Sequence, residues 1–267
     1  MYYLCKTMAN ILINIPSGKR LVWYLAAEEY FAKNIQRLNQ TYTKGKQNTE
    51  GNSSTFEGLF FTWIVPSTVI FGRHQVMQNE VNVEFCHLNN IAMYRRKSGG
   101  GCVYADEGNL MISYISPSTH SEQVFQFYLD QMSNTLSQLG YDAVKSTHND
   151  IMIGEHKVSG NACFALPQAT IVHGTLLYNV NFEILQQAIT PSTEKLAKHG
   201  VQSVRQRVMN LIDILPANDR CVGSIKHLSQ LVESIWCNIA YELTDSDLAA
   251  IDAIEQEYLT PAFINRL

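Results

Sequence analysis

The sequence predicts an α+β fold, in which mixed β-sheets are flanked by helices. Apolar residues recur at helical spacing near both ends of the chain, over residues 19–34, 224–241 and 243–258. Runs rich in β-branched and aromatic residues lie between residues 59 and 180 instead, with helical segments among them. The chain contains no internal repeat. This arrangement argues for an α+β domain built around a central group of strands.

The first helix is expected over residues 19–34, where apolar side chains share one face. Glu28 and Glu29 fall outside that face, so we expect both carboxylates in solvent. Residues 1–17 are interpreted as a lead before this helix. Residues 40–56 are polar, contain glycine and carry almost no aliphatic side chains, which predicts a mobile surface loop.

Strands are expected on both sides of turn-forming residues in the middle of the chain. Residues 59–65 and 68–71 are separated by Pro66 and Ser67, a pattern typical of a hairpin. The remaining central elements are strands over residues 91–94, 110–116, 151–153, 158–164 and 169–180, and short helices over residues 82–89 and 182–189.

The longer helices carry recognisable end signals. The helix over residues 122–139 is expected to end at Gly140, because glycine is favoured just after a helix. Thr244 and Asp247 form a box-like capping pattern at the start of the last helix. Ser224 is a candidate N-cap for the helix before it.

The composition argues against several classes of protein. With 46% hydrophobic and 16% charged residues, the 267-residue chain can bury a sizeable core. The formal net charge is −4 and there is no long basic run, which disfavours nucleic acid as a partner. No apolar run reaches the roughly 18 residues of a membrane helix. The six cysteines form no CxxC pair and indicate reduced thiols, so a cytoplasmic protein is expected.

Residues 95–113, RRKSGGGCVYADEGNLMIS, are the strongest candidate for a binding site. The three glycines at residues 99–101 can adopt positive φ angles and let a ligand lie against the backbone. Consecutive amides in such a turn bind anions. Arg95 and Arg96 add guanidinium groups, which suit carboxylate or phosphate oxygens. A hairpin turn with surface arginines is the alternative, because a glycine motif alone is weak evidence.

A second segment, NDIMIGEHKVSGNACF at residues 149–164, places Lys157 in a short loop between two apolar runs. Gly154 and Gly160 lie on either side of it and permit close approach to the backbone. A compact ammonium group can bridge a carboxylate and an α-phosphate, and can stabilise negative charge that accumulates between them. An exposed lysine without a catalytic role is the alternative.

Together, RRxSGGGxVYxDxGN and NDI…GxKVSGxA resemble the lipoate–protein ligase A family, within the superfamily of biotin and lipoate attachment enzymes. FGRHQ at residues 71–75, HGTLLYN at 173–179 and KHGVQSVRQRVMNL at 198–211 follow in the matching order. The resemblance spans roughly residues 18–260. It implies that the protein activates lipoate or octanoate with ATP and Mg²⁺ to an acyl-adenylate. The acyl group is then transferred to a lysine of a carrier protein.

The resemblance also implies roles for individual residues, with Lys157 as the catalytic group. The set implied to bind ATP and the lipoyl-adenylate is Arg96, Ser98, Gly99, Gly100, Gly101, Cys102, Val103, Tyr104, Asn109, Asn149, Asp150, Lys157, Gly160, His173, Gly174 and Thr175. Those implied to cover the adenylate are Ser203, Arg205, Arg207 and Asn210. Asp150 is a candidate metal ligand, with a turn residue as its alternative, and His173 is equally consistent with a structural role.

Three rival functions remain. One group of octanoyltransferases resembles the ligases but carries a catalytic cysteine about where Asn149 and Asp150 stand here. This sequence has no cysteine between Cys102 and Cys163, and both are expected to pack as small hydrophobic side chains. A biotin–protein ligase would carry a GRGRxGR-type loop, which is absent. A non-catalytic carrier-binding paralogue would have lost Lys157 or the glycines.

Many bacterial members of the family continue into a C-terminal accessory domain. This chain stops at Leu267, so we expect residues 1–267 to form a single catalytic domain without that accessory domain. A separate accessory protein is then a possible partner for lipoate activation. The expected acceptors are lipoyl domains of 2-oxo acid dehydrogenase complexes and the glycine cleavage H protein. The composition leads us to expect no nucleic-acid or membrane partner.

Overall fold

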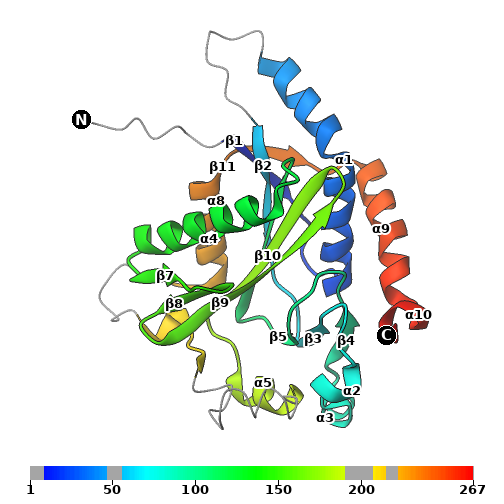
Figure 1. Cartoon of the computed structure of the whole chain (residues 1–267), viewed down its shortest axis with the longest axis vertical. Helices are drawn as coiled ribbons and strands as arrows, with labels where there is room; N and C mark the ends of the chain where they lie inside the picture. Colours follow the sequence, from blue (N-terminus) through cyan, green and yellow to red (C-terminus); the bar gives the residue numbers. More distant parts are fainter. Residues whose placement is uncertain (1–8, 47–55, 190–206, 215–221, 267) are drawn as a thin grey trace.

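The structure is a computed structural model that describes residues 9–46, 56–189, 207–214 and 222–266 (Figure 1). Within this part of the chain, the main feature is an eight-stranded mixed sheet. β1 runs parallel to β11 and β2, and every later neighbouring pair is antiparallel. In spatial order the strands are β11 (Cys237–Glu242), β1 (Ala9–Asn14), β2 (Phe56–Trp63), β6 (Asn109–Ser116), β10 (Ala169–Leu177), β9 (His156–Leu166), β8 (Asp150–Ile153) and β7 (Ala143–Lys145).

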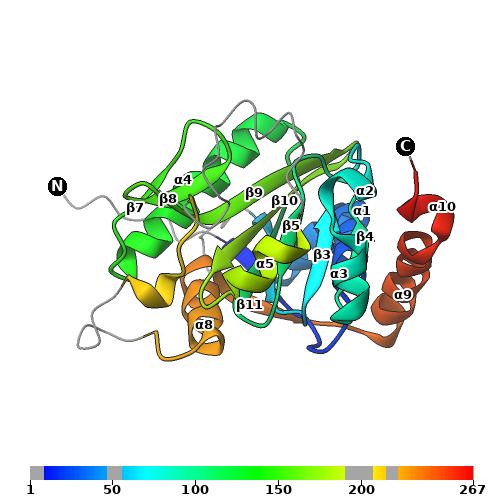
Figure 2. The ribbon, with the colours of Figure 1, turned by 90° about the horizontal axis from the view of Figure 1, so that it is seen from below.

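A smaller sheet has the strand order β4-β3-β5, with β3 parallel to β4 and antiparallel to β5. Three short helices, α2, α3 and α5, share an apolar cluster with it, and α3 and α5 contact its opposite edges (Figure 2). The bounds are β3 (Thr68–Phe71), β4 (Ala92–Arg95), β5 (Val103–Ala105), α2 (Met77–Glu80), α3 (Val83–Leu88) and α5 (Phe182–Ala188).

Longer helices cover both faces of the main sheet, as the two views show (Figures 1 and 2). Alternate side chains of β2 explain how this arises, because successive residues of a strand point to opposite faces. Leu59 and Phe61 pack with α1, whereas Phe60 packs with α4 and α8. The helices are α1 (Leu21–Lys46), with α9 (Asp245–Leu259) and α10 (Pro261–Ile264) outside it, and α4 (Ser121–Gln138) and α8 (Ile225–Trp236) opposite.

The structure confirms the α+β class and several helix ends. The Ser224 side chain accepts a hydrogen bond from the His227 amide, and Thr244 with Asp247 forms the predicted capping box. Gly140 follows α4 with a φ of 94°. Among the described residues, no helix is both long and apolar enough to cross a membrane.

Helix α1 is longer than predicted, and its surroundings differ from the prediction. Residues 40–46 are helical and not part of a loop, whereas residues 47–55 lie outside the described residues. Part of the expected lead, residues 9–14, forms β1 between β11 and β2. The sequence alone does not reveal this strand, because a run of six residues carries no sign of its partner strands. One of them, β11, lies more than 200 residues further along the chain.

Two predictions of local structure are wrong. β2 and β3 form no hairpin, because β1 and β6 occupy both edges of β2 and the chain crosses to the smaller sheet after Pro66. Residues 237–242 form β11 and do not continue α8. A short apolar run fits helical and strand spacing equally well. These residues form a strand because they pair with the edge of β1 that β2 leaves open.

Candidate active site

The glycine loop connects β4 to β5 across the end of β3, so its residues 96–102 lie between the two edges of the smaller sheet. Gly72, which follows β3, packs directly against this loop. A Cβ atom at Gly72 would overlap the Gly100 carbonyl oxygen, and Gly100 itself has a φ of 89°. The loop therefore requires glycine at both positions.

Arg95 holds the base of the loop and is only 2% exposed. Its Nη1 donates to the carbonyl oxygens of Gly72, Arg73 and Gln75, and its Nε donates to Ile264 in α10 at 2.9 Å. The guanidinium also stacks 4.7 Å from the ring centroid of Phe71. Arg95 is thus a structural group, and the prediction that both arginines are available to a ligand is wrong for this residue.

Arg96 is also buried, and its hydrogen bonds shape the loop itself. Its Nη2 donates to the Gly99 and Gly101 carbonyl oxygens at 2.8 and 2.6 Å, and its Nη1 donates to Ile70. Burial lowers the pKa of Arg96 to about 10, so the side chain remains charged at neutral pH. The loop therefore encloses a fixed positive charge beside the cavity described next.

A cavity of about 130 Å³ lies between the glycine loop and β9–β10 of the main sheet. The apolar side chains that line it are Leu25, Trp63, Ile70, Met111 and Ala162. The rest of the lining contains most of the residues predicted from the sequence: Arg96, Gly100, Gly101, Cys102, Val103, Asn149, Lys157, Gly160, His173, Gly174 and Thr175. Segments separated by more than 70 residues thus converge on one site.

Lys157 lies within β9 and not in a loop, at a point where the register with β8 shifts by one residue. Its Nζ is 2.7 Å from Asp150 Oδ1, and its side chain is 34% exposed. A Cβ atom at Gly160 would lie 2.6 Å from this Nζ, so the absent side chain leaves room for the lysine. The bulge and Gly160 together direct the ammonium group into the cavity.

Lys157 also borders a second cavity, of about 240 Å³. Its other lining residues are Asp150, Met152, Glu155, Arg207 and Val208. Lys157 therefore belongs to both cavities, and most of the residues that line the second one are charged. Of the residues predicted to cover the adenylate, Arg207 is exposed beside this second cavity, whereas Ser203 and Arg205 lie outside the described residues.

Some predicted residues lie away from the first cavity. The Tyr104 side chain is buried and its hydroxyl is 3.0 Å from Ser67 Oγ; burial raises its pKa to about 12. Asn109 is fully buried at the start of β6. Asn210 bonds both backbone groups of Val180, which indicates a structural role. Ser98 and Gly99 do not line the cavity. Both accept hydrogen bonds from Arg96 and in this way help to hold the shape of the loop.

The sequence interpretation missed a buried network behind the cavity. Glu28 is only 3% exposed, and its Oε2 lies 3.0 Å from His173 Nδ1, so the expectation that it faces solvent is wrong. His173 Nε2 lies 2.8 Å from Ser98 Oγ. Glu28 stands one helical turn after Leu25, which lines the cavity, and this spacing was the available signal.

Glu29 is also buried, 6% exposed, and belongs to a neighbouring ion-pair cluster. Lys97 Nζ lies 2.8 Å from Glu29 and 2.7 Å from Glu257 of α9. Its ammonium is 4.8 Å from the ring centroid of Tyr258. Lys97 thereby connects the glycine loop to α1 and α9, and α9 covers the carboxylate that was expected in solvent.

The described cysteines form no disulfide with one another. Burial raises the pKa of Cys163 to about 11, and its Sγ lies 3.9 Å from the Ser121 carbonyl oxygen. Cys102 borders the cavity and packs with the apolar cluster of the smaller sheet. A thiol with a raised pKa is a poor nucleophile at neutral pH, so Cys163 packs as a hydrophobic side chain, as predicted.

The family described as the lipoyl protein ligase A/B catalytic domain matches residues 23–229. The chain belongs to this family. Lipoate–protein ligase 1 from Staphylococcus aureus is 31% identical over 238 residues, which cover 87% of this chain. They cover 66% of that relative, so this chain spans slightly less than two thirds of its length.

Two solved structures share the fold of this family member. A bi-partite lipoate protein ligase from Thermoplasma acidophilum has a TM-score of 0.75 at 22% identity, and the match covers 96% of each chain. A lipoate-protein ligase A bound with ATP has a TM-score of 0.75 at 20% identity, covering 97% of this chain and 100% of that one. These likenesses confirm the predicted fold class.

Proposed function

We propose that this chain is the catalytic part of an ATP-dependent lipoate–protein ligase. It would convert lipoate and ATP to lipoyl-AMP and pyrophosphate, and then transfer the lipoyl group to a lysine of a carrier domain. The observation that carries this proposal is the position of Lys157. Lys157 lines both cavities, and the glycine loop borders the first of them.

The two cavities suit the two parts of an acyl-adenylate. Leu25, Trp63 and Met111 offer apolar surface to a hydrocarbon tail and a dithiolane ring. The carboxylate of such an acid would lie toward Lys157 and Thr175. The second cavity, with Asp150 and Arg207, would receive the nucleotide on the other side of the lysine. The glycine loop and Arg96 supply backbone amides and positive charge for phosphates.

Lys157 would act electrostatically in both steps. In the first, a carboxylate oxygen attacks the α-phosphorus and the bond to pyrophosphate breaks, with its electron pair leaving on pyrophosphate. In the second, the acceptor amine attacks the acyl carbon, loses a proton, and AMP departs. Negative charge increases on oxygens beside the ammonium in each transition state, which is where a fixed cation lowers the barrier. No covalent enzyme intermediate is required.

Asp150 would hold Mg²⁺ through its carboxylate. Among the described residues, no three histidine, cysteine or acidic side chains are grouped so that they could hold a metal ion together. A single carboxylate suits Mg²⁺, because this ion usually takes its other ligands from water and substrate phosphates. Mg²⁺ would neutralise phosphate charge during adenylation. Asp150 now pairs with Lys157, so nucleotide binding would rearrange this pair.

The comparisons support these substrates and partners by analogy. One structural relative was solved bound with ATP, and another is described together with its E2 lipoyl domain. We propose lipoyl domains of 2-oxo acid dehydrogenase complexes as acceptors, with the glycine cleavage H protein as a further one. A separate accessory protein would assist adenylation if the chain alone performs only the transfer.

The test is pyrophosphate release by the purified chain given ATP, Mg²⁺ and lipoate, followed by mass spectrometry of an added lipoyl domain. We expect pyrophosphate release and a lipoylated acceptor. Transfer from supplied lipoyl-AMP without pyrophosphate release would indicate that an accessory protein is needed. Failure of both reactions, with transfer from octanoyl carrier protein, would overturn the proposal in favour of an octanoyltransferase.

A further inference from the structure

A continuous line of hydrogen bonds leads from the glycine loop into α1. Arg96 Nε lies 3.0 Å from Ser98 Oγ, and Ser98 Oγ lies 2.8 Å from His173 Nε2. His173 Nδ1 lies 3.0 Å from Glu28 Oε2. The His173 side chain is 13% exposed and borders the cavity, whereas Glu28 does not line it. Glu28 therefore contacts the site only through other residues.

The donors and acceptors in this line give it a direction. Ser98 Oγ accepts from Arg96, so its own hydrogen is available to His173 Nε2. The imidazole then carries its hydrogen on Nδ1 and donates it to Glu28. We assign this tautomer to His173 from its hydrogen-bond partners. Replacing the Glu28 carboxylate with an amide would remove its charge and leave one acceptor oxygen for the two donors, Ser113 and His173.

Glu28 is itself held firmly. Its Oε1 accepts a hydrogen bond from Ser113 Oγ at 2.6 Å, and Ser113 Oγ accepts one from Trp63 Nε1 at 2.9 Å. Both carboxylate oxygens are thus occupied, and both partners belong to β-strands of the main sheet. The rigid part of the fold therefore determines where His173 and Ser98 lie.

The other end of the line controls the loop. Arg96 holds the Gly99 and Gly101 carbonyl oxygens, so its orientation fixes the direction of the peptide groups around Gly100. We propose that Glu28 is a positioning residue. Acting through His173 and Ser98, it fixes Arg96 and orients the glycine loop for the nucleotide phosphates. The nucleotide part of this inference rests on the proposed function.

A double-mutant cycle tests the route of this effect. We expect Glu28→Gln to weaken binding of Mg²⁺–ATP about tenfold, because a charge-assisted hydrogen bond contributes on this scale. Ser98→Ala should have a similar effect. If Glu28 acts through Ser98, the double variant binds ATP about as well as either single variant, as measured by calorimetry. Losses that multiply in the double variant would overturn the proposed route.

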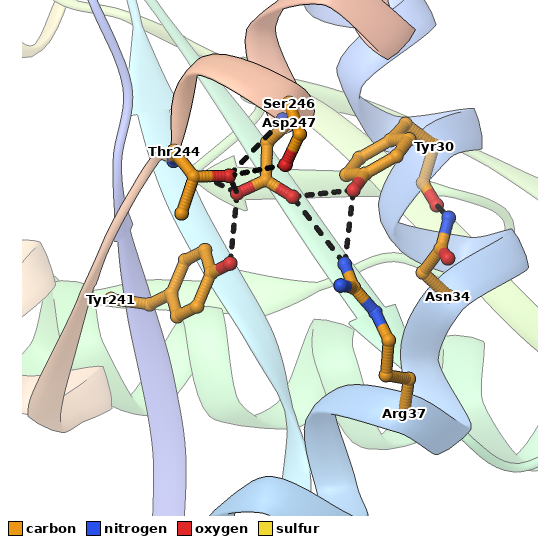
Figure 3. Close-up of polar contacts among 7 residues, drawn as sticks. All are labelled: Tyr30, Asn34, Arg37, Tyr241, Thr244, Ser246 and Asp247. Atoms are coloured by element: carbon orange, nitrogen blue, oxygen red, sulfur yellow. Dashed lines mark hydrogen bonds and ion pairs between the residues drawn. The ribbon is translucent and has the colours of Figure 1, made fainter.

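The matched control is Asp247→Asn, which removes another buried carboxylate packed on α1 (Figure 3). Its partners are Tyr30, Arg37, Tyr241 and Thr244, and none of them borders the cavity. This variant should lower the melting temperature and leave ATP binding unchanged. Equal weakening of ATP binding by Asp247→Asn and Glu28→Gln would reduce the role of Glu28 to general stability.

Two measurements decide the positioning role without any nucleotide. In ¹⁵N spectra of histidine-labelled wild-type protein, His173 should show a protonated Nδ1 and an unprotonated Nε2. In Glu28→Gln, amide hydrogen exchange at Arg73, which donates to the Ser98 carbonyl oxygen of the loop at 2.9 Å, should accelerate about tenfold, as expected when a stabilising hydrogen bond is lost. The opposite tautomer, or unchanged exchange at Arg73, would refute the inference. If wild type alone binds no ATP, the nucleotide part of the inference fails, and these two results still decide the positioning role of Glu28.

Discussion

Helix α1 contributes to two buried polar networks, which differ in where they end. Near the middle of α1, Tyr30 and Arg37 contact Asp247 of α9, and Tyr241 of β11 donates to the same carboxylate at 2.8 Å (Figure 3). Thr244 completes the group as the cap of α9. The members of this network belong to α1, β11, α9 and the cap of α9, and none of them borders the cavity, so the network closes on itself.

The Glu28 network begins on the same helix but ends at the glycine loop. Its members are spread over α1, β6, β10 and the loop, and His173 and Arg96 border the cavity. A closed network can only stabilise the fold. A network that ends at a binding loop also determines the geometry of that loop, so damage to it should change function as well as stability.

The largest effect on activity is expected at Lys157, which lines the same cavity as His173 and Arg96. Lys157→Ala should reduce acyl transfer about 10²- to 10³-fold, the usual loss when one electrostatic stabiliser of a transition state is removed. The rate of lipoylation of a carrier domain measures this effect. Lys145→Ala is the control, because Lys145 pairs with Asp130 on the surface. Equal activity of the two variants would contradict the role of Lys157.

The closed network should determine acid stability. Burial alone would raise the pKa of Asp247, but hydrogen bonds from Tyr30, Thr244 and Tyr241 outweigh burial and hold it well below the usual range. The resulting stabilisation is present above about pH 4, the unfolded value, and is lost as the pH falls below it. Asp247→Asn should cost about 1–3 kcal/mol at neutral pH and flatten this acid dependence. Urea unfolding at several pH values checks both results.

Alanine substitutions at two glycines distinguish the effect of loop geometry on ATP binding from the effect of backbone strain on stability. Gly100 and Gly140 have similar φ angles, 89° and 94°, and a side chain at either position is strained by about 1–2 kcal/mol. A Cβ atom at Gly100 would lie 3.0 Å from Arg96 Nη2, whereas one at Gly140 meets nothing within 4 Å. Both alanine variants should lose similar stability, and only Gly100→Ala should weaken ATP binding. Weakened binding in both would remove the distinction.

The smallest effect is expected for Tyr30→Phe in the closed network. Burial and then Asp247 raise the pKa of Tyr30 to about 12, so the protonated hydroxyl stabilises the fold. This contribution is complete below about pH 10 and is lost as the pH rises toward 12. The substitution should cost about 1 kcal/mol at neutral pH and leave lipoylation unchanged. Thermal unfolding at pH 7 and pH 11 measures the stability, and a change in lipoylation rate would contradict the account.

The sequence predicted features that depend on neighbouring residues and missed those that depend on residues far away along the chain. The Thr244–Asp247 cap, the end of α4 at Gly140 and the glycine loop are signalled by residues within four positions of one another. The burial of Glu28 depends on His173, which is 145 positions away, and no local pattern carries that information. The family motifs did indicate residues that line the cavity, because a family resemblance implies which distant segments of the chain come together in the fold.

The errors have the same origin. Arg95 looks like a ligand-binding group in the sequence, but its partners are carbonyl oxygens of a distant turn and of α10. Residues 237–242 became a strand because β1 offered a free edge. In each case the deciding partner lies far away along the chain.

The most direct test of the central claim is an experimental structure of this chain with lipoyl-AMP. The account predicts that the acyl tail lies against Trp63 and Met111, and that the phosphate meets the glycine loop. Lys157 Nζ should leave Asp150 and lie within hydrogen-bonding distance of the acyl phosphate. A structure in which Lys157 stays paired with Asp150, and the adenylate binds away from both cavities, would contradict the account.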